Sequence, residues 1–244
     1  MEEKTLNRLT EILRPAKRMV FFGGAGVSTE SGIPDFRSRD GLYSQKYDVP
    51  PETMLSHSYF IRHPEDFFRF YRDKMNSLWA HPNAAHETLA HWEAEGRLAA
   101  VVTQNIDGLH QAAGSRTVYE LHGSTHRTYC MKCRKRYGPE AIFDSGDPVP
   151  RCSCGGIIRP DVVLYEEGLD NATVNGAVRA IMESDVLLVA GTSLTVYPAA
   201  GLLRYFAGDA LVLINRDETA MDDQAALCIH ESVGQVLGAV RELL

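Results

Sequence analysis

Short apolar runs that end in glycine or polar residues constrain the fold of this chain most strongly. Such runs occupy residues 19–22, 99–103, 185–190 and 210–214. Shorter strands are expected at residues 117–121, 162–164 and 227–229, and helices at 6–13, 86–95, 171–182, 198–206 and 233–243. This alternation of strands and helices predicts an α/β fold built on a doubly wound parallel sheet.

Polar clusters follow directly after these strands. They are Gly23 to Ser28, Gln104 to Asp107, His122, Gly191 to Ser193, and Asn215. Ligands of doubly wound sheets bind outside the carboxyl ends of the strands. We therefore expect these five clusters to converge on one ligand site at one edge of the sheet.

The first strand leads into the glycine-rich segment from Gly23 to Gly26, and a Ser/Thr-rich segment that could begin a helix comes next. Glycine lets the backbone turn sharply and approach a ligand, and a helix start offers free N–H groups to a phosphate. Thr29 stands where the usual dinucleotide fingerprint has its third glycine, so a turn without a ligand stays an alternative. The continuation GIPDFR, residues 32–37, places a proline, an acid, an aromatic and a cation in one loop, which favours a ligand site.

The composition is that of an ordinary globular protein. The 244 residues are 44% hydrophobic and 23% charged, with a formal net charge of −7, which gives no support for nucleic-acid or membrane partners. Residues 1–18 lack the apolar core of a secretory signal, and no apolar run approaches the ~20 residues of a membrane span. We expect a cytoplasmic monomer with one main domain and a smaller module.

Four of the five cysteines form a separate polar module. Cys130 and Cys133 are followed, after eighteen residues, by Cys152 and Cys154. Two such pairs can close a tetrahedron around zinc, with Zn–S bonds of ~2.3 Å, and four thiolates leave no open position for catalysis. The spacing predicts a structural zinc site, with two incidental cysteine pairs as the alternative. Cys228 lies in an apolar strand and is expected to be a buried small hydrophobe.

Residues 39–78 are rich in aromatic side chains and are interrupted by prolines. Phe67, Phe68, Phe70 and Tyr71 predict a packed amphipathic helix. We interpret these rings as part of a core rather than as a cofactor site.

Several long motifs resemble those of the sirtuin family of NAD-dependent protein deacylases, in the family's order. They are GAGVSTESGIPDFRS, QNIDGLH, LHGS, the four-cysteine module, GTSL and the strand that ends in Asn215. The resemblance implies a Rossmann-type NAD-binding domain formed by residues 1–38, 79–126 and 159–244. A helical insertion (39–78) and a zinc module (127–158) would form the small domain.

The resemblance also implies an activity. The chain would be a bacterial-type, NAD-dependent protein-lysine deacetylase that transfers the acetyl group to ADP-ribose and releases nicotinamide. Its cofactors would be NAD and Zn²⁺, and its substrates acetylated-lysine proteins or peptides. Mono-ADP-ribosyl transfer to protein and removal of longer neutral acyl groups are alternatives within the same family.

Site residues follow from the resemblance, position by position. His122 matches the catalytic base, and Asn105 is expected to assist in catalysis. The residues expected to bind NAD are Gly24, Ala25, Gly26, Thr29, Asp35, Phe36, Arg37, Gln104, Asn105, Ile106, Asp107, Gly191, Thr192, Ser193, Asn215 and Ile229. Val163 and the segment Glu167-Gly168-Leu169 match the two backbone edges between which an acyl-lysine peptide adds as a strand, with Val163, Gly168 and Leu169 as the expected substrate-binding residues. Cys130, Cys133, Cys152 and Cys154 would bind the metal. His81, His86, His91 and His126 lack the strand-end context of His122 and are expected to be structural.

Two departures from the family pattern bear on function. Gly23 stands where the family usually has threonine, which should loosen the turn. Members that remove acidic acyl groups carry a tyrosine and an arginine at the positions that Phe68 and Tyr71 occupy here. Because a buried carboxylate without a partner is costly, we expect acetyl or other neutral acyl groups to be preferred.

Two other classes of function compete with this interpretation. A nicotinamide dehydrogenase needs an acidic residue about 20 positions past the glycines, where this chain has a proline-broken aromatic segment. Absorbance at 340 nm would detect its hydride transfer. The second is a zinc-ribbon module that binds protein or nucleic acid without catalysis. The acidic balance of this chain and its lack of a basic stripe argue against nucleic acid.

Overall fold

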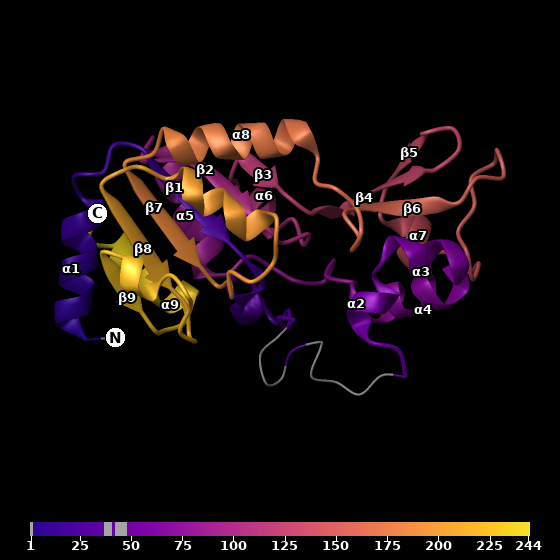
Figure 1. Cartoon of the computed structure of the whole chain (residues 1–244), viewed down its shortest axis with the longest axis horizontal. Coiled ribbons are helices and arrows are strands. Elements are labelled where there is room, and N and C mark those ends of the chain that lie inside the picture. The colour runs from indigo at the N-terminus through magenta and orange to yellow at the C-terminus, as the bar shows by residue number, and fades with distance from the viewer. Residues whose placement is uncertain (1, 37–40, 42–47) are drawn as a thin grey trace.

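A six-stranded sheet forms the centre of the larger of two lobes (Figure 1). In the computed structural model, which describes residues 2–36, 41 and 48–244, the strand order is β3-β2-β1-β7-β8-β9. The strands are β1 (Met19–Gly23), β2 (Leu98–Thr103), β3 (Val118–Glu120), β7 (Val186–Ala190), β8 (Ala210–Ile214) and β9 (Leu227–Ile229). All neighbouring strands pair in parallel. The chain therefore winds outward from β1 on one side and from β7 on the other, which confirms the predicted doubly wound sheet.

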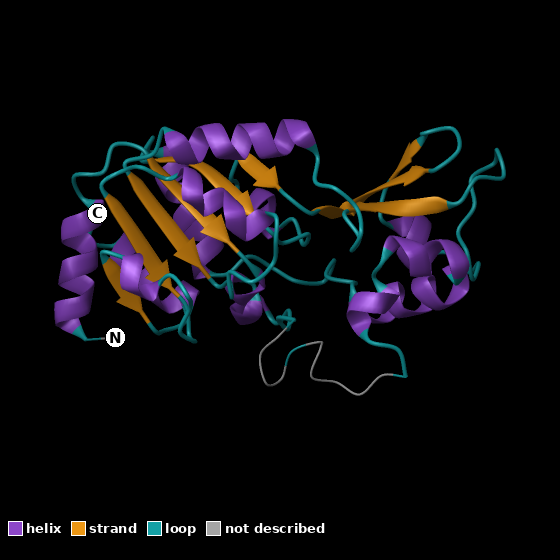
Figure 2. Cartoon of the chain, in the orientation of Figure 1, coloured by secondary structure: helices purple, strands orange, loops and turns teal. Residues whose placement is uncertain are grey.

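Helices cover both faces of this sheet (Figure 2). Helices α1 (Glu3–Leu13), α5 (Ala84–Ala94) and α9 (Val233–Arg241) pack on one face. Helix α8 (Asn171–Met182) and the 3-10 helix Ala199–Tyr205 pack on the other. Since side chains alternate along a strand, Met19 and Phe21 join the first core and Val20 and Phe22 the second. This burial on both faces explains why β1 is a continuous apolar run.

The smaller lobe contains a second sheet and a cluster of helices. Strands β5 (Arg136–Tyr137), β4 (Gly123–Cys130) and β6 (Ile158–Val162) pair antiparallel in that order. The helices are α2 (Pro51–Met54), α3 (His57–Arg62), α4 (Pro64–Lys74) and α7 (Glu140–Phe143). The strand predicted at residues 162–164 is observed at Ile158–Val162, in this small sheet.

Aromatic rings form the core of the smaller lobe. Phe67, Phe68, Phe70 and Tyr71 of α4 are buried, which confirms the predicted packed helix. The rings of Phe60 and Phe67 lie 4.7 Å apart, and Tyr71 stacks on Phe143 at 5.6 Å. This core also contains Cys130, Cys152 and Ile158, so the helical segment and the cysteine module pack as one unit.

The glycine-rich segment after β1 differs from the expected helix start. It forms two 3-10 turns, Ala25–Val27 and Thr29–Ser31, instead of an α-helix. Ser28, between them, has φ −95° and ψ 0°, outside the helical region. Gly26 N–H donates to Gly191 O at 2.8 Å, so the packing against the loop after β7 determines the path of the segment. No helix in the described part of the chain is long and apolar enough to cross a bilayer.

Candidate active site

The loops at the carboxyl ends of the strands are joined through Gln104. Its backbone N–H donates to Gly23 O at 2.9 Å, and its side-chain Nε2 donates to Thr192 Oγ1 at 3.0 Å. Its carbonyl oxygen accepts a hydrogen bond from Nδ1 of His122 at 2.9 Å. Gln104 thus connects the loops that follow β1, β2, β3 and β7, and the expected convergence of these polar loops is observed.

Glycines allow two of these loops to touch. A Cβ on Gly24 would lie 2.8 Å from Gly191 O, and one on Gly26 would lie 2.7 Å from Gly191 Cα. Gly191 itself has φ +58°, a left-handed conformation that favours glycine. The contact lies between β1 and β7, where the strand order reverses and where dinucleotides bind in such sheets. A side chain at any of these three positions would collide with the backbone of the facing loop, so the two loops could not pack this closely.

A buried polar cluster joins the loop after β1 to the loop after β2. Ser28 Oγ donates to Asp107 Oδ2 at 2.7 Å and accepts from Asn105 Nδ2 at 3.1 Å. Burial raises the pKa of Asp107 above its ordinary value, and hydrogen bonds from Leu109 N–H and Ser28 offset part of that rise. Sequence reasoning singled out Asn105 and Asp107, whereas it placed Ser28 in the polar cluster after the first strand without giving it a role of its own. Its place inside the GAGVS motif was the available signal.

His122 lies between the end of β3 and the start of β4. A carbonyl oxygen can only accept, so Nδ1 carries the proton in its bond to Gln104 O, and Nε2 remains the basic nitrogen. Burial lowers the pKa of His122 below its ordinary value, and the bond to Gln104 opposes this only in part. The imidazole is therefore neutral near neutral pH, as a general base must be.

The loops after β8 and β9 form the outer part of the site. Asn215 N–H donates to Ile229 O at 3.0 Å, and its Nδ2 donates to Asp217 O at 2.7 Å. Thr29 Oγ1 accepts a hydrogen bond from Arg216 Nη2 at 2.8 Å. This bond joins the region to the loop after β1, residues 24–31, which we call the cofactor loop. The side chain of Ile229 is buried in the sheet core, so only its main chain faces the predicted site.

The remaining predicted cofactor residues are placed as follows. Ser193 is exposed and its hydroxyl lies 2.8 Å from that of Thr195. Ile106 O accepts from the N–H and the hydroxyl of Thr125, and Phe36 packs partly buried against the core of the smaller lobe. Asp35, which precedes Phe36 in the sequence, is half-buried. Arg37 lies outside the described residues.

Asn83 fastens the cofactor loop to helix α5, a role that sequence reasoning missed. Its Nδ2 donates to Val27 O at 2.8 Å and to Ser31 Oγ at 2.9 Å. Its Oδ1 accepts from Ala85 N–H at 2.9 Å and caps the helix. The Pro-Asn dipeptide before an amphipathic segment indicates a helix start, but nothing in it points to a contact with residues 27–31.

One of the two predicted substrate edges is hydrogen-bonded to His122. Val163 N–H donates to His122 O at 2.9 Å. Gly168 is exposed and Leu169 is half-buried in the segment that leads to α8. A turn over residues 164–167, closed by the bond from Glu167 N–H to Leu164 O at 3.0 Å, connects Val163 to the Gly168–Leu169 segment.

The four cysteines of the small lobe come together. Their sulfur atoms all lie within 4.8 Å of one another, although eighteen residues separate the two pairs. Lys132 and Cys133 donate backbone N–H groups to Cys130 Sγ, both at 3.4 Å. Tyr137 donates its hydroxyl to Cys152 Sγ at 3.0 Å. Four clustered sulfurs with donors around them fit a tetrahedral zinc ion.

Comparisons with known proteins agree with this arrangement. Residues 24–198 match the Sir2 family. A protein of Clostridium acetobutylicum named NAD-dependent protein deacetylase is 58% identical over 238 residues, which are 96% of this chain and 97% of that protein. One of Clostridium perfringens with the same name is 54% identical over 244 residues, or 98% of this chain and 99% of that protein.

Solved structures are similar over the same length. A Sir2 variant with a deacetylated p53 peptide and 3′-O-acetyl-ADP-ribose has a TM-score of 0.91 at 37% identity, and the match covers 98% of each chain. A Sir2 structure with a p53 peptide and NAD⁺ has a TM-score of 0.87 at 38% identity and covers 100% of this chain and 98% of that one. The chain therefore belongs to the Sir2 family, the sirtuins.

Proposed function

We propose that this chain is an NAD-dependent protein-lysine deacetylase that transfers the acetyl group to ADP-ribose and releases nicotinamide. One observation carries the proposal: His122, with Nε2 free to accept a proton, is joined through Gln104 to the two glycine-containing loops of the switch point. Relatives of nearly the same length are named for this activity.

Several groups of this chain suit the binding of NAD. Gly24 and Gly26 let the loops after β1 and β7 pack together at the switch point, and Asn105 and Asp107 present buried polar groups in the adjoining loop. When bound, NAD supplies a reactive ribosyl carbon, a nicotinamide leaving group and ribose hydroxyls. Asn105 and Ser28 would orient the nicotinamide half, whereas Ser193 and Asn215 would hold the phosphate and adenosine half.

His122 would act as the general base. Its neutral Nε2 can take a proton from a ribose hydroxyl, and the bond from Nδ1 to Gln104 O holds the ring in the tautomer that this step needs. The rest of the catalysis is positioning, because the acetyl oxygen must be held in line with the ribosyl carbon.

The acyl-lysine peptide would add as a strand between Val163 and the Gly168–Leu169 edge. A Sir2 structure with an acetylated peptide is 37% identical to this chain, with a TM-score of 0.87. Main-chain hydrogen bonds would provide most of the binding free energy of the peptide. Because these bonds do not depend on the peptide's side chains, a broad range of acetylated proteins is the expected substrate class.

Neutral acyl groups suit this chain better than acidic ones. Phe68 and Tyr71 are fully buried in the aromatic core of the small lobe, and neither side chain carries a positive charge that could pair with an acyl carboxylate. A comparison of kcat/KM on acetyl-lysine and succinyl-lysine forms of one peptide tests this, and faster use of the succinyl form would contradict it.

The decisive experiment is mass spectrometry of an acetyl-lysine peptide incubated with the enzyme, with and without NAD. We expect the peptide to lose its acetyl group only with NAD, and O-acetyl-ADP-ribose and nicotinamide to appear. His122→Ala should abolish turnover while zinc content and the thermal midpoint stay unchanged. ADP-ribosylated peptide as the main product would favour transferase activity, and a change at 340 nm would favour a dehydrogenase.

Two broader expectations belong to the same proposal. Residues 1–38, 79–126 and 159–244 would form the NAD-binding domain, and residues 39–78 and 127–158 the small domain. The shared aromatic and cysteine core supports the grouping of the helical insertion with the cysteine module, although residues 123–126 and 159–162 pair within the small sheet. A cytoplasmic setting is supported by the four clustered thiols, which a reducing compartment keeps available for metal.

A further inference from the structure

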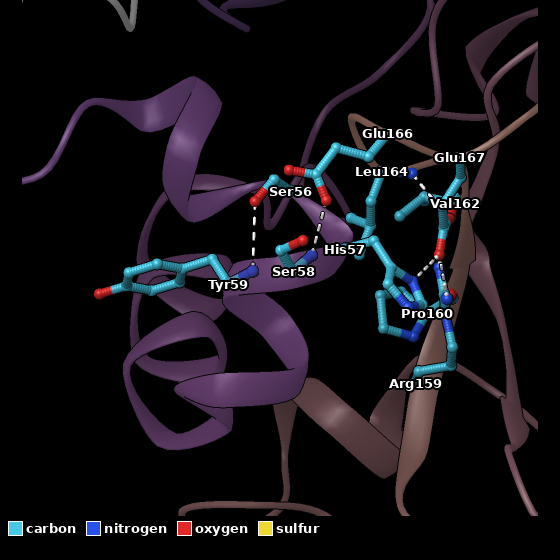
Figure 3. A network of polar contacts seen from close by, with 10 residues as sticks. All are labelled: Ser56, His57, Ser58, Tyr59, Arg159, Pro160, Val162, Leu164, Glu166 and Glu167. Atoms are coloured by element: carbon cyan, nitrogen blue, oxygen red, sulfur yellow. Dashed lines mark hydrogen bonds and ion pairs between the residues drawn. The ribbon is translucent and has the colours of Figure 1, made fainter.

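The carboxylate of Glu167 makes polar contacts with three other residues, Arg159, Leu164 and His57. Arg159 reaches it with Nη1 at 2.6 Å and Nη2 at 3.0 Å, and the backbone N–H of Leu164 donates at 2.9 Å (Figure 3). His57 Nδ1 lies 2.8 Å from the same Oε1 that Arg159 Nη1 contacts. The carboxylate therefore joins strand β6, the substrate edge and helix α3.

This cluster is charged and mostly buried. Arg159 is only 6% exposed, and its guanidinium lies 5.5 Å from the centre of the Phe60 ring. Burial raises the pKa of Glu167, but the bonds from Arg159, Leu164 and His57 outweigh it and lower the pKa to about 2. Desolvation makes a buried ion pair a weak source of stability, so such a pair is better explained by the geometry that it imposes.

The cluster determines the path of residues 163–167. Arg159 Nη2 also donates to Val162 O at 2.8 Å, immediately before the residue whose N–H donates to His122 O. On the other side, His57 N–H donates to Tyr165 O and Tyr165 N–H donates to Leu55 O, both at 3.0 Å.

The turn itself is unusual at Glu166. This residue has φ 75°, a left-handed conformation that is uncommon for a residue with a Cβ. Its carboxylate accepts from the Ser58 N–H at 2.9 Å, at the start of α3. Such a conformation persists only where its surroundings enforce it, and Glu166 and Glu167 both tie the turn to α3.

We propose that Glu167, held by Arg159 and His57, is a positioning residue that fixes the peptide-binding edge at residues 163–169 relative to His122. The inference rests on the proposed deacetylase function and deepens it. In this role the Glu167 carboxylate holds the backbone at which an acyl-lysine strand pairs.

Three variants test this role. Glu167→Gln keeps the length and one acceptor but loses the charge, and Arg159→Lys keeps the charge but loses the two-point contact. We expect each to raise the KM for an acetyl-lysine peptide by roughly tenfold, the equivalent of one charged hydrogen bond. The KM for NAD should stay unchanged. His57→Ala truncates a side chain that is 45% exposed and should raise the peptide KM by about threefold.

The matched control is Glu183→Gln. It removes a carboxylate from another Arg–Glu pair, Arg18 Nη2 to Glu183 Oε2 at 2.7 Å, at the far end of the sheet. We expect no change in either KM. Zinc content and the thermal midpoint are measured for every variant.

The outcomes separate the two proposals. If the wild-type enzyme does not deacetylate the peptide, the proposed function fails and the positioning role falls with it. If the wild type is active but Glu167→Gln and Arg159→Lys keep its peptide KM, only the positioning role is overturned. An equal rise in both KM values, with loss of zinc, would also overturn it in favour of general structural support. Should Glu167→Gln not fold, His57→Ala and Arg159→Lys decide the question in the same way.

Discussion

Ser28 Oγ lies 2.7 Å from Asp107 Oδ2, although the two residues are 79 positions apart in the chain. Both side chains are buried, and Asn105 donates to the same hydroxyl. This contact closes the loop after β1 onto the loop after β2, and it makes the nicotinamide half of the predicted site a single hydrogen-bonded unit.

Removing the Ser28 hydroxyl should damage this unit. Ser28→Ala leaves Asn105 without an acceptor and Asp107 without one of its donors, at a cost of about 1–3 kcal/mol in the free energy of unfolding. We expect kcat to fall by at least about tenfold, since the orientation of the nicotinamide half would be lost. Urea unfolding and steady-state kinetics measure the two effects. Ser232→Ala is the control, because the Ser232 side chain makes no capping bond to its helix. Equal behaviour of the two variants would refute the assignment.

The acid limb of the pH–rate profile should report His122. Burial lowers the pKa of His122 below its ordinary value of 6.5, so the neutral base persists to lower pH. Activity should be lost as the pH falls through this lowered pKa, which places the midpoint of the acid limb below pH 6.5. The measurement is kcat/KM for the peptide between pH 5 and 8, about the range in which a histidine titrates, with circular dichroism as a check on folding. A midpoint above the ordinary value would mean that another group limits the rate.

Asn83 should affect NAD binding through the cofactor loop. Asn83→Asp keeps the helix cap but cannot donate to Val27 O or Ser31 Oγ, whereas Asn83→Ala loses both functions. We expect both variants to raise the KM for NAD by roughly tenfold, and only the alanine variant to lose about 1 kcal/mol of stability from the cap. The peptide KM should not change. An NAD KM equal to that of the wild type in Asn83→Asp would show that the two donor bonds do not position the loop.

Tyr137 should slow the release of zinc. Its hydroxyl donates to Cys152 Sγ, and that bond, together with the Cys154 backbone N–H, lowers the pKa of Cys152 to about 6. Tyr137→Phe removes only the hydroxyl, and we expect metal affinity to fall by about tenfold or more. Transfer of zinc to a chromogenic chelator follows the loss. Tyr129→Phe is the matched control, since Tyr129 lies on the neighbouring strand β4 and its ring lies 4.2 Å from the guanidinium of Arg134. Identical release from both variants would contradict the prediction.

Two buried histidines should make the fold sensitive to acid. Both ring nitrogens of His110 and Nε2 of His86 are buried without a hydrogen-bond partner among the residues that the structure describes. Burial lowers the pKa of His86 to about 4 and that of His110 well below 6.5. Between these values the unfolded chain binds protons that the folded chain does not, so the free energy of unfolding falls as the pH falls.

His110→Phe tests this linkage. The phenyl ring keeps the contact with Phe21, whose ring centre lies 6.0 Å from that of His110, but it cannot titrate. Urea unfolding from pH 6.5 to 4 should show a slope shallower by up to about 1.4 kcal/mol per pH unit, the contribution of one proton. A wild-type slope in His110→Phe would exclude His110 as a source of the acid sensitivity.

The sheet and the metal cluster could be predicted because they depend on local patterns. Strands 210–214 and 227–229 and helix 171–182 were expected with the bounds that the structure has. Continuous apolar runs indicate strands that are buried on both faces of the sheet, and the CxxC and CxC pairs indicate a site formed by four sulfur atoms. The segment after β1 was harder, because its 3-10 turns depend on the contact of Gly26 with Gly191, which comes 165 residues later in the chain.

The amino-acid order by itself determined the α/β class, the strand-end polar clusters, the four-cysteine module and the residues that carry the resemblance to sirtuins. Only the tertiary structure decided how these parts support one another. It showed that Ser28 hydrogen-bonds to Asp107, Asn83 to the cofactor loop and Arg159 to Glu167. Periodicity and spacing report burial and local turns, but a hydrogen bond between distant segments depends on how the sheet and the two lobes pack, which no local pattern contains.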